Sequence, residues 1–545
     1  SSIFFWDQIT GEAFFWEDFT EYVYPTQSYA ASEFADGSIP FWNPYTFSGM
    51  PFLADLQVGF FYPFNRVLSF FAEPDGKLPV AALQLMIILH FFIAQLTFYI
   101  LARGWKISSL GAIIGAVSYA FSLIMVCHVI HPMIVYHLAW FPLVVYFFHK
   151  GIVRQSIKFA SLAGLFLGIS MLSGHPQMTL YEAFFLGVMF IWYLIAGIKD
   201  KELGSGGIVK FIAASILPMI IGAGIFCIQY LPSQELADRS QRAEMTYEKA
   251  SEGSLEVKQL YTAIVPKVFG FVNGSQDRSA PFYLTYEDPA TDREQRAPYY
   301  YYWETAFYAG LVALILGILG AVMKIRTRQG AFLTFAAIFG IFFALGANSF
   351  IFPIFHNLPF FDQFRNPARM IFYTVFALSI FAGFGFDTLW QGGKNLMMKF
   401  LIVTGIFLLL TFLVASGAVL SGFNTPEQIT SEIQSFGTTA LIFLILIAIV
   451  VILTIRGLFQ PFVSGVILII LAIFDLNFAG GDFNVSQTNP EESYQIDQQL
   501  KSTLKPNPPE EIFRVNMRSY EPRYMAMQRN QGLIDRIMLV EGYNP

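Results

Sequence analysis

Apolar runs long enough to cross a lipid bilayer recur along this 545-residue chain and constrain its fold more than any other feature. A spanning helix needs about 17–25 predominantly apolar residues. Runs of roughly this kind, some of them short, lie at 80–102, 110–126, 134–148, 159–172, 178–198, 208–228, 305–323, 331–345, 370–389, 400–420, 439–455 and 462–474. Only 13% of the residues are charged, about half the share of a soluble domain. The sequence therefore predicts an all-α polytopic membrane protein with about 12–13 transmembrane helices.

Short basic loops follow every second apolar run. Cytoplasmic loops of membrane proteins carry an excess of lysine and arginine, so these loops are expected to be cytoplasmic and the segments between them extracytoplasmic. The basic residues are Arg103, Lys106, Lys150, Arg154, Lys158, Lys199, Lys201, Lys210, Lys324, Arg326, Arg328, Lys394, Lys399 and Arg456. A net charge of −6 without a basic stripe indicates no nucleic-acid partner.

The chain divides into five regions on this basis. Residues 1–79 form a first extracytoplasmic loop with catalytic-type acids, and 80–228 form transmembrane helices. Residues 229–303 form a long extracytoplasmic loop, 304–476 form further transmembrane helices, and 477–545 form an extracytoplasmic C-terminal region. The chain begins without methionine or a signal peptide, and both ends are expected to be incomplete.

The segment 17–63 is polar and aromatic, without helical or strand periodicity. Loops of this length are usually functional or disordered, and its aromatic residues, such as Trp42, Phe52 and Phe60, are too apolar for a solvated linker. We expect it to fold onto the membrane surface and to present acids there. Glu17 and Glu21 are expected to be solvated.

Two acids of this region are candidate catalytic residues. Asp18, between Trp16 and Phe19, would be partly desolvated and could act as a general base. Asp55 lies in the apolar run MPFLADLQVGFFYP, where an isolated acid needs a partner or a metal. The alternative for Asp18 is an interfacial acid solvated by water and lipid headgroups.

Histidines gather in the segment CHVIHPMIVYH. His128 and His131 have i, i+3 spacing, so with Asp18 or Asp55 they could hold a divalent cation. The alternative, favoured for this group together with His137, is that the histidines cap helix ends at the interface. SGHPQ, which contains His175 and Gln177, predicts a helix break, which membranes tolerate where the backbone lines a polar cavity. His175 could orient a substrate phosphate or hydroxyl there.

Arg365 and Arg369 in FDQFRNPARM precede a span on the outer side, against the usual charge bias. Two guanidiniums at this spacing could bind a phosphate, although a headgroup anchor or a pair with Asp362 is the alternative. QYLPSQELADRSQR, which contains Gln229, Glu235 and Arg242, forms a further polar cluster.

These segments together resemble the YfhO-like family of bacterial multi-spanning proteins in the GT-C glycosyltransferase superfamily. The matching stretches are GSIPFWNPYTFSGMPFLADLQVGFFYP, HLAWFPLVVYFF, SGHPQMTLY, QYLPSQELADRSQR, FRNPARMIFYTVFALSIFAGFGFD and FRVNMRSYEPRYMAMQRNQGLIDRIMLVEGYNP. The resemblance implies a GT-C-like bundle in the bacterial inner membrane and chemistry on the extracytoplasmic face. It also implies a polyprenyl-phosphate sugar donor, with Asp18 at the position of the first-loop acid and Asp7 as an alternative. Arg365 or Arg369 would balance the leaving phosphate.

The sequence thus favours an inverting glycosyltransferase that moves a sugar from a lipid-linked donor to a cell-envelope acceptor. Its partners would be the donor, membrane lipids and other subunits of a membrane complex; a divalent cation is a candidate cofactor. Two alternatives stay open: a non-catalytic accessory subunit of a membrane complex, and a transporter or flippase of lipid-linked precursors.

Overall fold

The computed structural model describes residues 1–73, 76–238, 245–272, 281–283, 285–288, 293–296, 302–391, 394–420, 427–483, 485–504, 513–516 and 529–544. Within these residues, eight helices are long and apolar enough to cross a membrane. A bent helix pair, Ser109–Ala120 with Leu123–Ile130, meets the same test, and Ile157–Met171, Leu311–Lys324 and Arg328–Ala344 are shorter apolar helices. All twelve predicted apolar runs coincide with these helices, so the all-α polytopic architecture is confirmed.

In the described residues, no strand-rich domain separates the N-terminal region from the first helices of the bundle. The region before the bundle contains α1 (Trp6–Thr10), β1 (Phe14–Phe15), the π-helix η1 (Phe19–Val23), α2 (Tyr24–Ala35), η2 (Leu56–Val58), α3 (Pro63–Val67) and η3 (Leu68–Phe71). The bundle begins with α4 (Val80–Gly104), α5 (Ser109–Ala120), α6 (Leu123–Val126), η4 (Cys127–Ile130), α7 (Pro132–Arg154), α8 (Ile157–Met171), α9 (Pro176–Lys199) and α10 (Ser205–Asp238).

Short elements connect the two halves of the bundle and follow its second half. The connection contains α11 (Tyr247–Ala250), η6 (Val257–Ala263), β2 (Gly270–Val272), β3 (Pro281–Tyr283), β4 (Thr285–Asp288), β5 (Arg293–Arg296) and α12 (Tyr302–Thr305). The second half contains α13 (Leu311–Lys324), α14 (Arg328–Ala344), η7 (Gly346–Asn348), α15 (Ile351–His356), η8 (Phe361–Gln363), η9 (Pro367–Ile371), α16 (Phe372–Thr388), η10 (Leu389–Gln391), α17 (Lys394–Ala415), η11 (Ala418–Leu420), α18 (Glu427–Ile455) and α19 (Pro461–Gly480). The C-terminal region contains β6 (Val485–Ser486), α20 (Pro490–Ser493), α21 (Gln498–Leu504) and α22 (Gln531–Asp535).

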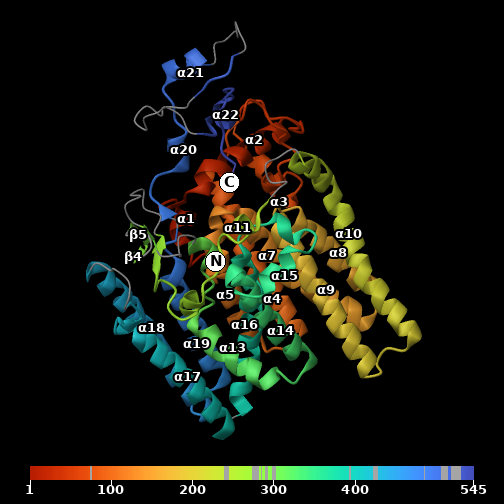
Figure 1. Cartoon of the computed structure of the whole chain (residues 1–545), viewed down its shortest axis with the longest axis vertical. Coiled ribbons are helices and arrows are strands. Elements are labelled where there is room, and N and C mark those ends of the chain that lie inside the picture. Colours follow the sequence, from red (N-terminus) through yellow and green to blue (C-terminus); the bar gives the residue numbers. More distant parts are fainter. Residues whose placement is uncertain are drawn as a thin grey trace.

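Helices α7 and α16 form the centre of the bundle, with α10 on one flank and α17 and α18 on the other (Figure 1). The most apolar windows of α7 and α16 are 83% and 78% buried, whereas that of α17 is only 22% buried. Helices α13 and α16 pack closely because both present glycine at their crossing. A Cβ on Gly320 would lie 2.0 Å from the Phe381 carbonyl oxygen, and one on Gly385 would lie 1.9 Å from that of Leu316. Small residues let membrane helices approach in this way.

The N- and C-terminal regions lie together at one end of the bundle (Figure 1). Strand β1 pairs with β6 in an antiparallel register, with Phe14 opposite Ser486. Tyr494 donates a hydrogen bond to the Thr20 carbonyl oxygen at 2.8 Å. Two further antiparallel pairs, β2 with β3 and β4 with β5, lie in the connection between the bundle halves. The N- and C-terminal regions, which the charge pattern predicts to lie on the same side of the membrane, are therefore in contact.

The segment 17–63 contains more regular structure than the sequence predicts. Residues Tyr24–Ala35 form helix α2, of which nine residues from Tyr24 to Ser32 are buried. Because this helix is covered nearly all round, its sequence lacks the one-sided apolar pattern that identifies a surface helix. Phe52, Phe60 and Tyr62 are buried, in agreement with an ordered segment, whereas Trp42 is 55% exposed.

Helix α10 also extends beyond its predicted end. It continues to Asp238, so Gln229 and Glu235 lie on a helix and not in the predicted loop 229–303. At the other end of the bundle, Arg328 binds Asp200 at 2.7 Å and Glu202 at 2.8 Å. These three residues belong to two loops that the charge pattern assigns to the same side.

Candidate functional site

Asp18 lies just before η1 and joins three distant parts of the chain. His131 Nε2, at the start of α7, is 2.9 Å from one carboxylate oxygen, and the Tyr543 hydroxyl donates to the other at 2.6 Å. The Asp18 side chain is 19% exposed. Burial alone would raise the pKa of this carboxyl, but hydrogen bonds from His131 and Tyr543 and the charge of Arg365 bring its pKa below the usual value. Asp18 is therefore an anion at neutral pH.

His131 and His128 stand side by side, with ring centroids 5.8 Å apart. His128 Nδ1 lies 2.6 Å from the Ile124 carbonyl oxygen, and its Nε2 lies 3.5 Å from a carboxylate oxygen of Glu304. One ligand atom from each of His128, His131 and Glu304 lies within 4.8 Å of the others. This is the grouping within the described residues that could hold a metal ion. Asp18 contacts it through His131, and Asp55 is not part of it.

Glu304 is the centre of a second set of contacts. Arg369 donates to it through both Nε, at 2.7 Å, and Nη2, and Asn366 donates a further hydrogen bond at 3.1 Å. The Glu304 side chain is 2% exposed. Burial alone would raise the pKa of its carboxyl, but the charge and hydrogen bonds of Arg369 hold that pKa well below its usual value. Glu304 is therefore an anion although its side chain is buried.

The SGHPQ segment reaches the same arginine. Arg369 Nη1 lies 2.9 Å from Gln177 Oε1 and 3.1 Å from His175 Nε2. His175 Nδ1 also accepts from the Met178 amide at 3.2 Å, and a neutral imidazole has one accepting nitrogen, so only one of the two histidine contacts is a hydrogen bond. Burial, followed by the charge of Arg369, lowers the pKa of His175 well below its usual value. The ring is therefore neutral.

Gly174 allows this break between α8 and α9. Its φ is +100°, and a Cβ there would lie 2.1 Å from the Leu56 carbonyl oxygen of the first loop. Only glycine satisfies both the backbone conformation and the close approach. The predicted helix break is thus present, and the first loop packs directly against it.

The two arginines of FRNPAR have different surroundings. Arg369 is 13% exposed and is held by Glu304, whereas the Arg365 side chain is exposed. Among the described residues no hydrogen bond or ion pair engages the Arg365 guanidinium, and its charge lowers the pKa of Asp18. Asn366 between them has φ +60°, and its side chain does not cap the helix that follows. Its backbone N–H donates to the Glu252 carbonyl oxygen at 3.0 Å. The two guanidiniums therefore differ in their surroundings: Arg369 is held in an internal ion pair, and Arg365 is exposed.

Asp55 is buried and bound on all sides. It accepts from the Tyr22 hydroxyl at 2.7 Å, from the Asn544 amide at 3.0 Å and from the Gln57 backbone at 3.1 Å. The last contact caps η2. Asp18 and Asp55 are thus both bound by the C-terminal segment, through the adjacent residues Tyr543 and Asn544.

The predicted cluster at Gln229 has a packing role in the described part of the chain. Gln229 is buried and donates to the Leu53 carbonyl oxygen at 2.8 Å, which attaches α10 to the first loop. Glu235 is exposed on the last turns of α10. Arg242 lies outside the described residues. Asp7, the alternative acid, lies in the first turn of α1 and its side chain is exposed.

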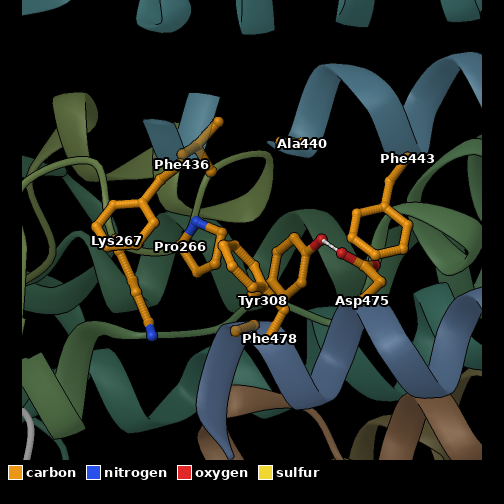
Figure 2. Close-up of a pocket in the computed structure, with 10 residues that line it drawn as sticks. Pro266, Lys267, Tyr308, Phe436, Ala440, Phe443, Asp475 and Phe478 are labelled. Carbon is orange, nitrogen blue, oxygen red and sulfur yellow. Dashed lines mark hydrogen bonds between the residues drawn. The ribbon is translucent and has the colours of Figure 1, made fainter. Parts of the chain in front are cut away.

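A separate apolar pocket lies between α18 and α19 and contains none of the predicted site residues (Figure 2). The Tyr308 hydroxyl donates to Asp475 in its wall, and the Leu311 amide donates to the same carboxylate at 2.7 Å. These bonds attach α19 to the start of α13. Lys267 binds Asp482 at 2.9 Å.

Glu304, Tyr543 and Asn544 are the site residues that the sequence analysis missed. Glu304 follows a run of four tyrosines and a tryptophan and directly precedes an apolar span. An acid at the edge of a span is a functional candidate by default, so this position carried a usable signal. No sequence signal identifies Tyr543 or Asn544, because they are 525 and 489 positions away from Asp18 and Asp55, the residues they contact.

Comparison with protein-family models found no match, and comparison with curated protein sequences found none. Among solved structures, the chain is similar to ArnT from Cupriavidus metallidurans, determined with bound undecaprenyl phosphate. The two share 11% sequence identity and a TM-score of 0.49, over 98% of this chain and 83% of the ArnT chain.

Proposed function

We propose that this protein is an inverting membrane glycosyltransferase of the GT-C type. It would move a sugar from a polyprenyl-phosphate donor to a cell-envelope acceptor on the extracytoplasmic face of a bacterial inner membrane. The observation that carries the proposal is an ionised carboxylate, Asp18, held by His131 and Tyr543 at one end of an apolar bundle, within electrostatic reach of the exposed Arg365 guanidinium. The sequence resemblance supplies the reaction class.

Asp18 has the capacity to bind an acceptor. An ionised carboxylate offers about four lone-pair sites, and His131 and Tyr543 occupy two of them. A substrate hydroxyl can therefore donate to the carboxylate without displacing either partner. Because the pKa of Asp18 is lowered, it is a weak base, and it would accept the proton as the new carbon–oxygen bond forms.

The leaving group would be a phosphate, and the exposed Arg365 guanidinium would balance its charge. The acceptor oxygen attacks the anomeric carbon from the face opposite the phosphate, the sugar–phosphate bond breaks, and its electron pair stays on the phosphate. The acceptor proton passes to Asp18. Configuration at the anomeric carbon is inverted. A guanidinium aimed where charge develops lowers the barrier of such a step.

The test is a transfer assay with the full-length protein in detergent or vesicles, polyprenyl-phosphate sugars and a panel of hydroxylated envelope acceptors. Wild type should release polyprenyl phosphate and form the inverted glycoside. Asp18→Asn should lower kcat/KM by roughly 100- to 10,000-fold, the usual range for a lost acid–base group. Asp36→Asn is the matched control, since Asp36 is an exposed acid of the same loop. Equal turnover by wild type and Asp18→Asn would refute the assignment of Asp18.

One observation favours a transporter as the second candidate. Within the bundle, His137 Nε2 of α7 and Glu182 of α9 lie 2.8 Å apart and are almost completely buried. Buried ionisable pairs in transmembrane helices mark ion or proton pathways in transporters. Uptake of a lipid-linked sugar into vesicles, lost in Glu182→Gln but kept in Asp18→Asn, would favour this function over transfer.

A further inference from the structure

His128, His131 and Glu304 offer three ligand atoms of the types that bind transition metals. The three atoms lie within 4.8 Å of one another, which allows one ion to contact all of them after small side-chain rotations. They come from η4, the residue before α7, and α12, so the chain brings them together only in the folded protein. The set is two imidazoles and one carboxylate.

Each of the three side chains is held in place by a second group. His128 Nδ1 faces the Ile124 carbonyl oxygen at 2.6 Å, His131 Nε2 faces Asp18 at 2.9 Å, and Glu304 Oε2 accepts from Arg369 Nε at 2.7 Å. Metal-binding histidines nearly always donate their other ring N–H to a carbonyl or carboxylate in this way. The contacts fix which nitrogen of each ring carries the proton.

The remaining ring nitrogens have lone pairs and lack hydrogen-bond partners. His128 Nε2 and His131 Nδ1 are both buried, and neither makes a hydrogen bond within the described residues. The His128 side chain is completely buried, and its Nε2 faces Glu304 at 3.5 Å. A buried polar atom without a partner costs free energy, and a cation would remove that cost at both rings.

We propose that His128, His131 and Glu304 bind a divalent transition-metal cation of the Zn²⁺ type. Two imidazoles and one carboxylate match zinc sites that keep an open coordination position, whereas Mg²⁺ and Ca²⁺ prefer oxygen ligands. Asp18 becomes a positioning residue for His131 in addition to its proposed contact with the acceptor. The open position would take an oxygen of the donor phosphate; this role rests on the proposed function, although binding of the cation does not.

The experiment measures metal binding without any substrate. Full-length protein carrying a tag without histidine is stripped with a chelator in detergent and titrated with Co²⁺, followed by its visible d–d absorption and by displacement with Zn²⁺. Wild type should bind about one equivalent. His131→Gln should lose the absorption, and Asp18→Asn should weaken binding by roughly 10- to 100-fold, as expected for a group behind a ligand.

His356→Gln is the matched control, because His356 packs edge-on against Tyr247 and is not part of the cluster. Glu304→Gln removes the partner of Arg369 and could unfold the protein, so His131→Gln, at a partly exposed position, decides the test. Unchanged Co²⁺ titration in His131→Gln, or no binding by wild type, would overturn the site. Sugar transfer without metal binding refutes the cation alone, whereas metal binding without transfer refutes the transferase alone.

Discussion

Asp18 and Asp55 belong to the same loop and are bound by adjacent tail residues, yet their surroundings differ. Asp55 is enclosed by Tyr22, Gln57 and Asn544, all from the loop or the tail. Asp18 instead faces His131 from the helix bundle and senses the charge of Arg365. The comparison shows that Asp55, in an apolar stretch of sequence, makes only contacts within the loop and tail. Asp18, in a more polar stretch, lies beside a histidine of the bundle and near a charged arginine.

The largest expected effect separates the two acids: a substitution of Asp55 should reduce stability, whereas a substitution of Asp18 should reduce sugar transfer. Asp55→Asn leaves a buried cluster with mismatched donors, so the free energy of unfolding should fall by about 1–3 kcal/mol. Its kcat/KM per folded molecule should stay within about threefold of wild type, in contrast to the loss expected for Asp18→Asn. Thermal unfolding and sugar transfer on the same preparations test both. A larger loss of sugar transfer in Asp55→Asn than in Asp18→Asn would contradict this difference between the two acids.

The next effect concerns the two arginines of the segment FRNPAR. Arg365→Gln should lower kcat/KM by about 10- to 100-fold with little change in melting temperature, because a charge-assisted contact to the donor phosphate is lost. Arg369→Gln should instead destabilise the fold by about 3–5 kcal/mol, since the buried Glu304 carboxylate would lose its arginine partner. Donor kinetics and thermal unfolding distinguish them, with Arg456→Gln, an exposed arginine at the opposite end, as the control. A stable Arg369→Gln with normal unfolding would contradict this division.

The smallest effect is a shift in pH dependence. The Tyr543 hydroxyl stabilises the Asp18 anion and contributes to its lowered pKa. Tyr543→Phe should raise the pKa of Asp18, so the acid limb of the kcat/KM–pH profile should move to higher pH. The anion's contribution to stability is present above the unfolded pKa and is lost as pH falls through the folded pKa. Asn544→Ala, which touches Asp55 instead, should leave the limb where it is; an equal shift in both variants would remove the distinction between the acids.

Much of the bundle could be predicted because helices in lipid follow simple rules. Their backbone groups must be satisfied within each segment, so length and hydropathy locate them, and the helix break at His175 follows from Gly174 and Pro176. Helix α2 escaped prediction because it is buried on nearly every side and shows no periodic pattern. The end of α10 was not predicted, because the helix continues through polar residues such as Gln229 after the apolar run has ended.

The candidate site could be predicted only in part. Asp18, His131 and Arg365 were identifiable by residue type and neighbouring sequence, and the structure brings them to one end of the bundle. The pairing of Arg369 with Glu304 was not, and it changes the role of that arginine from a ligand contact to an internal ion pair.

The amino-acid sequence by itself determined the helical architecture, the alternation of basic loops and the segments in which polar residues gather. These are local properties of composition, and a bilayer or a helix responds to them within about 20 residues. Only the tertiary structure decided which polar groups neutralise one another. The interactions of Asp18 with Tyr543 and of Arg369 with Glu304 depend on contacts between residues 525 and 65 positions apart, and such contacts follow from packing of the whole chain.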